Sequence, residues 1–306
     1  MMNKNRCVPS VSKSTNPNIE TPLVLAEPMA LAAAGDNRSV MEFYERFPCG
    51  GVETEDDERW VRLPWLQRAF EPDGHEGKRV LDLGCGIGID AEKFVEGGAM
   101  LVGVDFALKP LRIASARLKN HGVQGNWHLV RADLRALPFK SGAFDYVYSD
   151  WVLHHILGYE TAIQEAHRCL KNGGRGTALL YHKWSLMTVL TVLVRQVPWR
   201  NQIESGILRA LGFRQSKATE AGLAEVLRHP VIQYFTRSLV REKLREAGFV
   251  TASVDAYDWL YPLLRRMSNT LPGAIEQRLG RFLVAKFRKE SAIANQAGKN
   301  HSRATS

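Results

Sequence analysis

The stretch VLDLGCGIGID, residues Val80 to Asp90, decides the fold of this chain. It begins as an apolar run of the kind that forms a buried strand. It continues with glycine at positions 84, 86 and 88, and helical spacing follows. Glycine lets the backbone approach a ligand closely, and amides at a helix N-terminus point toward that ligand. The stretch therefore predicts a strand, a ligand-binding turn and a helix, in that order.

Strands and helices alternate after this stretch. Buried strands are predicted in MLVGVDF, NWHLVRAD, AFDYVYSD and GTALLYH, and helices in GIDAEKFVEGGA, LKPLRIASARLKNHG and YETAIQEAHRCLKNGG. Such alternation is typical of an α/β protein with a doubly wound, mostly parallel, Rossmann-like sheet. Its crossovers are right-handed, and its ligand lies at the carboxyl ends of the strands.

The pattern divides the chain into six parts. The alternation stops after the fifth strand, where helical apolar spacing predicts an inserted lid, and it returns with the helix SLVREKLREAGF and the strands VTASVDAY and RFLVAKFR. The predicted parts are a disordered leader (1–38), an N-terminal helical cap (39–77), the cofactor-binding core (78–182), the helical lid (183–234), the completion of the sheet (235–289) and a loose tail (290–306).

Composition indicates a globular protein. The chain has 306 residues, of which 45% are hydrophobic, and no apolar run is long enough to span a membrane. Glu27 and Pro28 interrupt the one stretch that resembles a signal-peptide core. The four cysteines have no CxxC spacing, and ETEDDE lacks a calcium-loop pattern, so neither disulfides nor a metal site are expected. These features predict a cytoplasmic location.

Positive charge is concentrated in the second half of the chain. The net charge is +9, and residues 183–306 contain 20 Lys and Arg against 9 Asp and Glu. Such an excess suits a nucleic acid, an anionic membrane surface, an acidic substrate or simply solvated helices. The basic half has no dense basic run with interleaved aromatics, which disfavours RNA binding.

Two carboxylates follow later strands. Asp105 ends the second strand, 21 residues after Gly84, where an acidic side chain can accept both hydroxyls of a ribose. Ile89 stands where a dinucleotide fingerprint needs glycine or alanine, which weakens the pyrophosphate interpretation. Asp133 follows the third strand and can accept from an adenine amino group. Together these residues predict a cofactor that contains a nucleoside.

The segments VLDLGCGIG, VGVDF, RADLRALPF, FDYVYSDWVLHHI and LKNGGRG, in this order, resemble the class I S-adenosylmethionine-dependent methyltransferases, in their small-molecule, methyltransferase type 11-like group. The resemblance covers residues 78–182, and REAGF with the strand after it resembles the family's sixth-strand region. It implies a seven-stranded sheet whose last strand is antiparallel.

The resemblance also implies a cofactor site for S-adenosyl-L-methionine, with S-adenosyl-L-homocysteine as product. The matching residues are Asp82, Gly84, Cys85, Gly86 and Gly88 beside the amino-acid part, Asp105 on the ribose, Phe106, Asp133 and Leu134 on the adenine, and Ser149 on the methionine part. Tyr44 and Phe47 lie on the N-terminal helix that covers the cofactor in relatives. Their rings are expected either to face the sulfonium or to pack in the core.

The chemistry requires alignment of a nucleophile with the methyl group, and a base only where the nucleophile must lose a proton. His154 and His155, after the fourth strand, are the first candidates for that base, and packing or capping of the next helix is the alternative for both. Tyr181 and His182, at the end of the fifth strand, are the second candidates, and a hydrogen-bonded rim is their alternative. The expected substrate-lining residues are Tyr44, His154, His182, Trp184, Tyr234 and Tyr261.

We therefore expect a methyltransferase that acts on oxygen, nitrogen or carbon of a small, aromatic or lipophilic acceptor. Two alternatives stay open: an RNA methyltransferase that uses the basic half, and a non-catalytic S-adenosylmethionine-binding scaffold. An (N/D)PPY motif is absent where SDWVLHH stands, which disfavours methylation of exocyclic amino groups on bases. The apolar stretch WSLMTVLTVLV of the lid suits a hydrophobic tunnel, contact with a membrane surface or simple packing of a helix against the sheet edge.

Overall fold

The computed structural model of the chain describes residues 24–25, 37–48, 60, 63–123, 126–185, 188–189, 192, 229–257 and 277–290. Its strands are β1 (Val24–Leu25), β2 (Arg79–Leu83), β3 (Met100–Asp105), β4 (Trp127–Arg131), β5 (Phe144–Asp150), β6 (Leu170–Tyr181), β7 (Phe249–Tyr257) and β8 (Phe282–Lys289). Its α-helices are α1 (Arg38–Arg46), α3 (Trp65–Phe70), α4 (Ile89–Glu96), α5 (Leu108–Asn120), α6 (Tyr159–Cys169) and α10 (Arg237–Glu246), with short 3-10 helices at Pro72–His75 and Leu153–His155.

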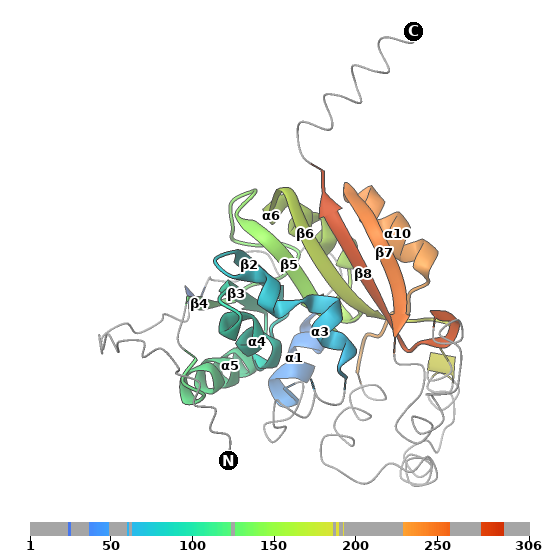
Figure 1. Cartoon of the computed structure of the whole chain (residues 1–306). Coiled ribbons are helices and arrows are strands. Elements are labelled where there is room, and N and C mark those ends of the chain that lie inside the picture. Colours follow the sequence, from blue (N-terminus) through green and yellow to red (C-terminus); the bar gives the residue numbers. More distant parts are fainter. Residues whose placement is uncertain are drawn as a thin grey trace, which may run out of the picture.

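The strands form one sheet in the order β1-β4-β3-β2-β5-β6-β8-β7 (Figure 1). Neighbours from β1 to β6 pair in parallel, whereas β8 is antiparallel to both β6 and β7. The order reverses at β2, because β3 lies on one side of it and β5 on the other. Open α/β sheets bind their ligands at such a switch point. The predicted doubly wound sheet is confirmed.

Each face of the sheet has its own core. Leu81 and Leu83 of β2 belong to the core that α6 and α10 cover, whereas Val80 belongs to the core under α3, α4 and α5. Alternate residues of a strand point to opposite faces, so a strand buried on both sides is apolar almost throughout. Figure 1 shows these two helical layers, one in front of the sheet and one behind it.

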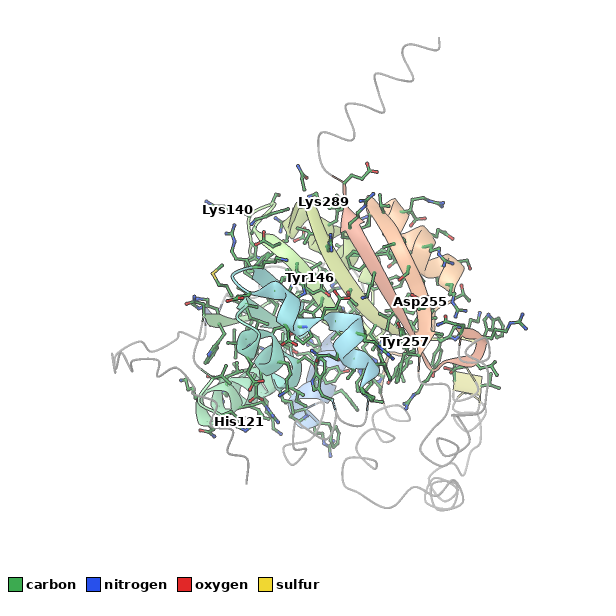
Figure 2. All side chains as sticks on the ribbon, in the orientation of Figure 1. His121, Lys140, Tyr146, Asp255, Tyr257 and Lys289 are labelled. Carbon is green, nitrogen blue, oxygen red and sulfur yellow. The ribbon has the colours of Figure 1, made fainter. Side chains whose placement is uncertain are left out.

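The predicted cap contributes α1 and α3. Figure 1 shows α1 below the sheet, near the ends of the parallel strands. The ring of Trp65, the first residue of α3, stacks on Tyr257 at the end of β7 with 5.0 Å between ring centroids. Tyr257 is labelled in Figure 2. Burial of an aromatic side chain contributes about 1.5–3 kcal/mol, so this contact fixes α3 over the sheet edge.

The chain leaves the sheet after His182 and returns beside it. The Phe235 amide donates to the Tyr181 carbonyl at 2.8 Å, and the Lys183 amide donates to the Phe235 carbonyl at 2.8 Å. The two ends of the predicted insertion are therefore neighbours. Most of residues 183–234, including the expected helical lid, lie outside the described residues.

Two details differ from the sequence interpretation. Val24 and Leu25, which we had assigned to the leader, pair in parallel with β4 and add an eighth strand at the sheet edge. The helix expected through residue 174 ends at Cys169, and β6 already begins at Leu170.

None of the helices in the described part of the chain is long and apolar enough to cross a membrane.

Candidate active site

The glycine turn joins β2 to α4 at the switch point of the sheet. The amides of Gly84 and Cys85 both donate to the Val104 carbonyl of β3, at 2.8 and 2.9 Å. Gly86 has φ +52° and Gly88 has φ +80°, a backbone conformation that favours glycine. Two strands and a helix N-terminus thus fix this turn.

The three glycines have different surroundings. A Cβ at Gly84 would lie 2.4 Å from Val152 Cγ2, and one at Gly88 would lie 3.0 Å from the Cβ of Ala114 on α5, so both allow close packing. A Cβ at Gly86 would have no atom within 4 Å. Gly86 therefore borders an open space that a side chain would fill and that a ligand can occupy.

Asp105 closes β3 beside this space. Its Oδ2 accepts from the Gly86 amide at 3.1 Å, and its Oδ1 accepts from the Ala107 amide at 2.9 Å. Burial raises the pKa of Asp105 to about 6, and the backbone N–H donors oppose that rise. A carboxylate has about four acceptor positions, so two hydroxyl donors can still bind to it.

Asp82, within the quoted stretch, lies in the buried layer below the turn. The Tyr148 hydroxyl donates to its Oδ2 at 2.7 Å. Burial raises the pKa of Tyr148 well above its usual value, so this phenol stays protonated and keeps donating. Cys85 is also buried, and burial raises the pKa of its thiol, so the side chain is a neutral packing group.

The Asp133 carboxylate is already held by Arg135. Arg135 Nη2 donates to Oδ2 at 2.7 Å, and its Nε lies 3.1 Å from each oxygen of Asp133. Nη1 of Arg135 continues to the Leu157 carbonyl at 3.3 Å. Leu134, between the two, is buried. An adenine amino group would have to share Asp133 with Arg135, so the predicted role of Asp133 stays a prediction.

Helix α1 is attached at both ends. Asn37, just before it, donates to the Leu157 carbonyl at 3.2 Å and accepts from the Leu157 amide at 3.0 Å. Glu45, near its end, accepts from the first amides of α5, those of Leu108 at 2.6 Å and Lys109 at 3.0 Å. A carboxylate at a helix N-terminus is favourable because it complements the helix dipole.

This attachment places Tyr44 between Phe106, at the end of β3, and His155, after β5. Its ring centroid lies 6.4 Å from that of Phe106, next to Asp105, and 6.1 Å from that of His155. Phe47, expected to act with Tyr44, is 47% exposed, and its ring lies under Arg46 at 5.2 Å. Of the two aromatics, Tyr44 is therefore the one inside the site.

A cluster of aromatic and histidine rings lies past the ends of β5 and β6. His154 is 0% exposed, and its ring centroid lies 4.2 Å from that of His155 and 4.1 Å from that of Tyr181. His229, from the return of the insertion, lies 3.8 Å from His155 and 5.3 Å from Tyr44. The structure thus brings together the three predicted catalytic residues and a further histidine.

Burial keeps the imidazoles of His154 and His155 neutral. It lowers the pKa of His155 to about 4, against the hydrogen bond to the Val231 carbonyl, which raises it. Burial also lowers the pKa of His154 well below its usual value, and His155 and His229 add to that effect. Within the described residues, no group of three or more His, Cys, Asp or Glu side chains is arranged to hold a metal ion.

The other predicted site residues are dispersed. Ser149 is buried and lines a cavity of about 20 Å³ between the sheet and helices α6 and α10. His182 donates through Nδ1 to the Gly280 carbonyl at 2.8 Å. Trp184 is 60% exposed beside Lys183, whereas Tyr234 lies 6.2 Å from Tyr181, at the cluster. The predicted Tyr261 lies outside the described residues.

Sequence reasoning did not predict the contacts of three residues that the structure places at the site. They are Arg135 on Asp133, Glu45 on the start of α5, and His229 in the ring cluster. Arg135 had a local signal, because an arginine two residues after an aspartate can pair with it. The contacts of Glu45 and His229 cross long stretches of chain and have no local signal.

Comparisons with known proteins agree with this geometry. Residues 81–177 match the model of a methyltransferase domain family. The chain is 33% identical over 115 residues to a ubiquinone biosynthesis O-methyltransferase of Pseudomonas aeruginosa, which covers 38% of this chain and 48% of that protein. It is 33% identical over 100 residues to a sterol 4-C-methyltransferase of Caenorhabditis elegans, covering 33% of this chain and 30% of that protein.

A solved S-adenosylmethionine dependent methyltransferase from Mesorhizobium loti superposes with a TM-score of 0.51 and 20% identity, covering 78% of this chain and 100% of that chain. This likeness shows a shared fold. The alignments span less than half the length of the two curated relatives, 48% and 30%.

Proposed function

Because residues 81–177 match a methyltransferase domain family, we propose that this chain is a class I S-adenosylmethionine-dependent methyltransferase and that the whole protein transfers a methyl group from S-adenosylmethionine to oxygen, nitrogen or carbon of a small, aromatic or lipophilic molecule. One observation carries the proposal. The Gly86 amide donates to the Asp105 carboxylate at 3.1 Å, and open space lies at the missing Cβ of Gly86. A backbone without side chains next to a ribose-binding acid fits an adenosyl cofactor.

The residues that hold the cofactor follow from this pair. The Gly86 backbone borders the amino-acid part, and the free acceptor positions of Asp105 bind the two ribose hydroxyls. Phe106, Asp133 and Leu134 would lie beside the adenine. Tyr44 closes the site from α1, and its ring can face the sulfonium through a cation–π contact of about 0.5–2 kcal/mol.

S-adenosylmethionine supplies an electrophilic methyl group: the acceptor atom bonds to the methyl carbon, the S–CH3 bond breaks, and its electron pair stays on sulfur. The protein mainly has to align the acceptor, and orientation can contribute roughly 7–11 kcal/mol. Buried rings exclude water from that alignment. Tyr44, Tyr181 and Tyr234 give the acceptor side an aromatic wall with few charges, which favours a planar or lipophilic acceptor.

A proton acceptor is available where the nucleophile has to lose a proton. His154 and His155 are the proposed bases, with Tyr181 beside them. Both imidazoles are neutral at physiological pH, because burial lowers their pKa values, so each has a nitrogen lone pair available. The quinone and sterol names of the relatives support a small lipophilic acceptor.

We also propose that the insertion contacts a membrane surface.

Transfer of a labelled methyl group tests this function. We would incubate the protein with methyl-labelled S-adenosylmethionine and an extract of the cells that make it, then separate small molecules, RNA and protein. The expected result is label in a small molecule that organic solvent extracts, and loss of that label with Asp105→Ala. Label in RNA, or retention of full activity by Asp105→Ala, would contradict the proposal.

A further inference from the structure

The backbone of one residue, Val231, contacts two histidines of the ring cluster. His155 Nδ1 lies 2.9 Å from the Val231 carbonyl oxygen, and the Val231 amide lies 3.1 Å from His229 Nδ1. Val231 is 76 residues after His155 in the sequence. The returning end of the insertion therefore reaches the turn after β5 through the Val231 carbonyl, whereas the Val231 amide orients the ring of His229 within the same segment.

These two contacts determine the protonation of both rings. A carbonyl oxygen only accepts, so Nδ1 of His155 carries the hydrogen and its Nε2 carries a lone pair in the neutral ring. A backbone N–H only donates, so Nδ1 of His229 carries the lone pair and its Nε2 carries the hydrogen. The neighbouring imidazoles are thus opposite tautomers, one accepting and one donating at Nε2.

The pair lies at the acceptor side of the site. The two ring centroids are 3.8 Å apart, and both rings are almost fully buried. The Tyr44 ring packs on both, with its centroid 6.1 Å from that of His155 and 5.3 Å from that of His229, and it also contacts Phe106 at 6.4 Å. Because Phe106 follows the ribose acid, the two imidazoles lie one aromatic ring away from the proposed cofactor.

We propose that His155 and His229 together bind a hydroxyl group of the acceptor, so that the attacked atom is oxygen. This inference rests on the proposed methyltransferase function. The hydroxyl donates its hydrogen to Nε2 of His155 and accepts, through one lone pair, from Nε2–H of His229. Its second lone pair is the nucleophile.

The chemistry of the pair favours oxygen over the other two atoms. An uncharged amine has a single lone pair, which a hydrogen bond from His229 would occupy. A carbon nucleophile has no lone pair for that hydrogen bond. An alcohol or phenol can donate its proton to His155 and accept from His229 with one lone pair. Its second lone pair can then attack the methyl carbon.

The proton of the hydroxyl moves to His155. As the oxygen attacks, its O–H bond breaks, the bonding pair stays on oxygen, and a new N–H bond forms at Nε2 of His155. The imidazolium releases this proton to water when the product leaves. His229 stays neutral throughout and acts as a hydrogen-bond donor.

Paired substitutions separate this role from a structural one. An asparagine can place an amide atom where Nδ1 of histidine lies, whereas a glutamine can place one where Nε2 lies. His229→Asn thus keeps an acceptor for the Val231 amide but loses the donor to the substrate, and His229→Gln does the reverse. We expect kcat/KM to fall about tenfold in His229→Asn, as for loss of one hydrogen bond, and less in His229→Gln. His128, exposed on β4, gives the control His128→Gln.

For His155, the expected loss in kcat is about 100-fold or more with His155→Asn, which keeps a donor to the Val231 carbonyl but removes the base. A His229→Gln variant that loses more activity than His229→Asn would overturn the donor role.

Long-range 1H–15N spectra of histidine-labelled protein check the tautomers without substrate. We expect His155 protonated at Nδ1 and His229 at Nε2; the same tautomer in both rings would overturn the inference.

The labelled product decides the attacked atom. A methoxy group in the product supports the inference. A new N–CH3 or C–CH3 group would overturn it while leaving the methyltransferase function in place. Failure of the folded wild-type protein to bind S-adenosylmethionine would instead overturn the proposed function itself, so the two failures can be distinguished.

Discussion

The Tyr148 hydroxyl on β5 donates a 2.7 Å hydrogen bond to the Asp82 carboxylate on β2. Both side chains are buried, and the two strands are parallel neighbours with Asp82 opposite Tyr148. Asp82 stands two residues before Gly84, so this bond holds the strand end from which the glycine turn begins. It connects the core packing of β5 to the proposed cofactor site.

Replacing Tyr148 with phenylalanine should weaken both stability and cofactor binding. The Asp82 carboxylate would lose a buried donor, which costs about 1.5–3 kcal/mol of unfolding free energy. Displacement of the turn should weaken S-adenosylmethionine affinity by about tenfold, which corresponds to 1.4 kcal/mol. Chemical denaturation and calorimetric titration measure the two effects.

Tyr146 provides the matched control. It lies two residues away on the same strand and donates to Thr177 at 2.7 Å (Figure 2). Tyr146→Phe should cost about 1 kcal/mol of stability and leave cofactor affinity unchanged. Equal losses of affinity in the two variants would show that Asp82 does not act through the turn.

Gly86→Ala should block the cofactor while the sheet stays folded. The added methyl group enters open space beside the turn, so it meets the ligand rather than the protein. The positive φ costs about 1–2 kcal/mol for any residue with a Cβ. Gly122 has φ +64° and similar open space but lies at the end of α5, away from the site.

Gly122→Ala should therefore show the same modest loss of stability with unchanged affinity. Thermal unfolding and cofactor titration of both alanine variants make the comparison. If Gly86→Ala binds S-adenosylmethionine as the wild type does, the space at Gly86 is not the cofactor site.

Cofactor affinity should depend on pH through Asp105. Burial raises the pKa of this group to about 6 in the free protein, above its ordinary value, so below pH 6 the carboxyl is largely protonated. Ribose hydroxyls bind best to the ionised form. Affinity should thus be constant above pH 6 and fall by up to about tenfold per pH unit below it.

Titrations between pH 5 and pH 8, in buffers of different ionisation enthalpy, measure this dependence and the proton released on binding. Asp105→Asn keeps the size of the side chain but cannot ionise. It should bind more weakly at pH 7 and lose the pH dependence in this window. A wild-type affinity that does not change from pH 5 to pH 7 would exclude Asp105 as the ribose ligand.

Glu45→Gln should loosen α1 and weaken cofactor binding. The Glu45 carboxylate accepts from two amides at the start of α5, and a glutamine amide offers only one oxygen and no charge. We expect a loss of about 1 kcal/mol in binding free energy, because Tyr44 on α1 closes the site. Glu96→Gln, which removes an exposed ion pair with Lys93, is the control and should bind normally. Identical affinities in the two variants would disprove the closing role of α1.

The alternation of apolar runs and helical spacing was sufficient to predict the sheet. Leu81 and Leu83 are buried on one face of β2, and Val80 is buried on the other. The continuous apolar run in the sequence therefore already indicated a core on each side of the sheet. The glycine turn and Asp105 were predictable for a similar reason, since both follow directly from the ends of strands. The antiparallel β8 was expected from the family resemblance and is confirmed.

Contacts between distant segments were not predictable. His229 joins His155 only because the insertion returns beside β6, and the residues between the two contain no signal for that return. Glu45 reaches α5 because α1 is also attached to Leu157 through Asn37. The strand β1 has two residues, too few to show a period. In each case the position depends on packing between segments rather than on local preference.

Calorimetric titration of the 306-residue chain with S-adenosylmethionine tests the central claim most directly. The glycine turn and Asp105 should bind one cofactor molecule per chain, and Asp105→Ala should remove most of the affinity without unfolding the protein. A folded wild-type protein that takes up no S-adenosylmethionine at millimolar concentration would contradict the account.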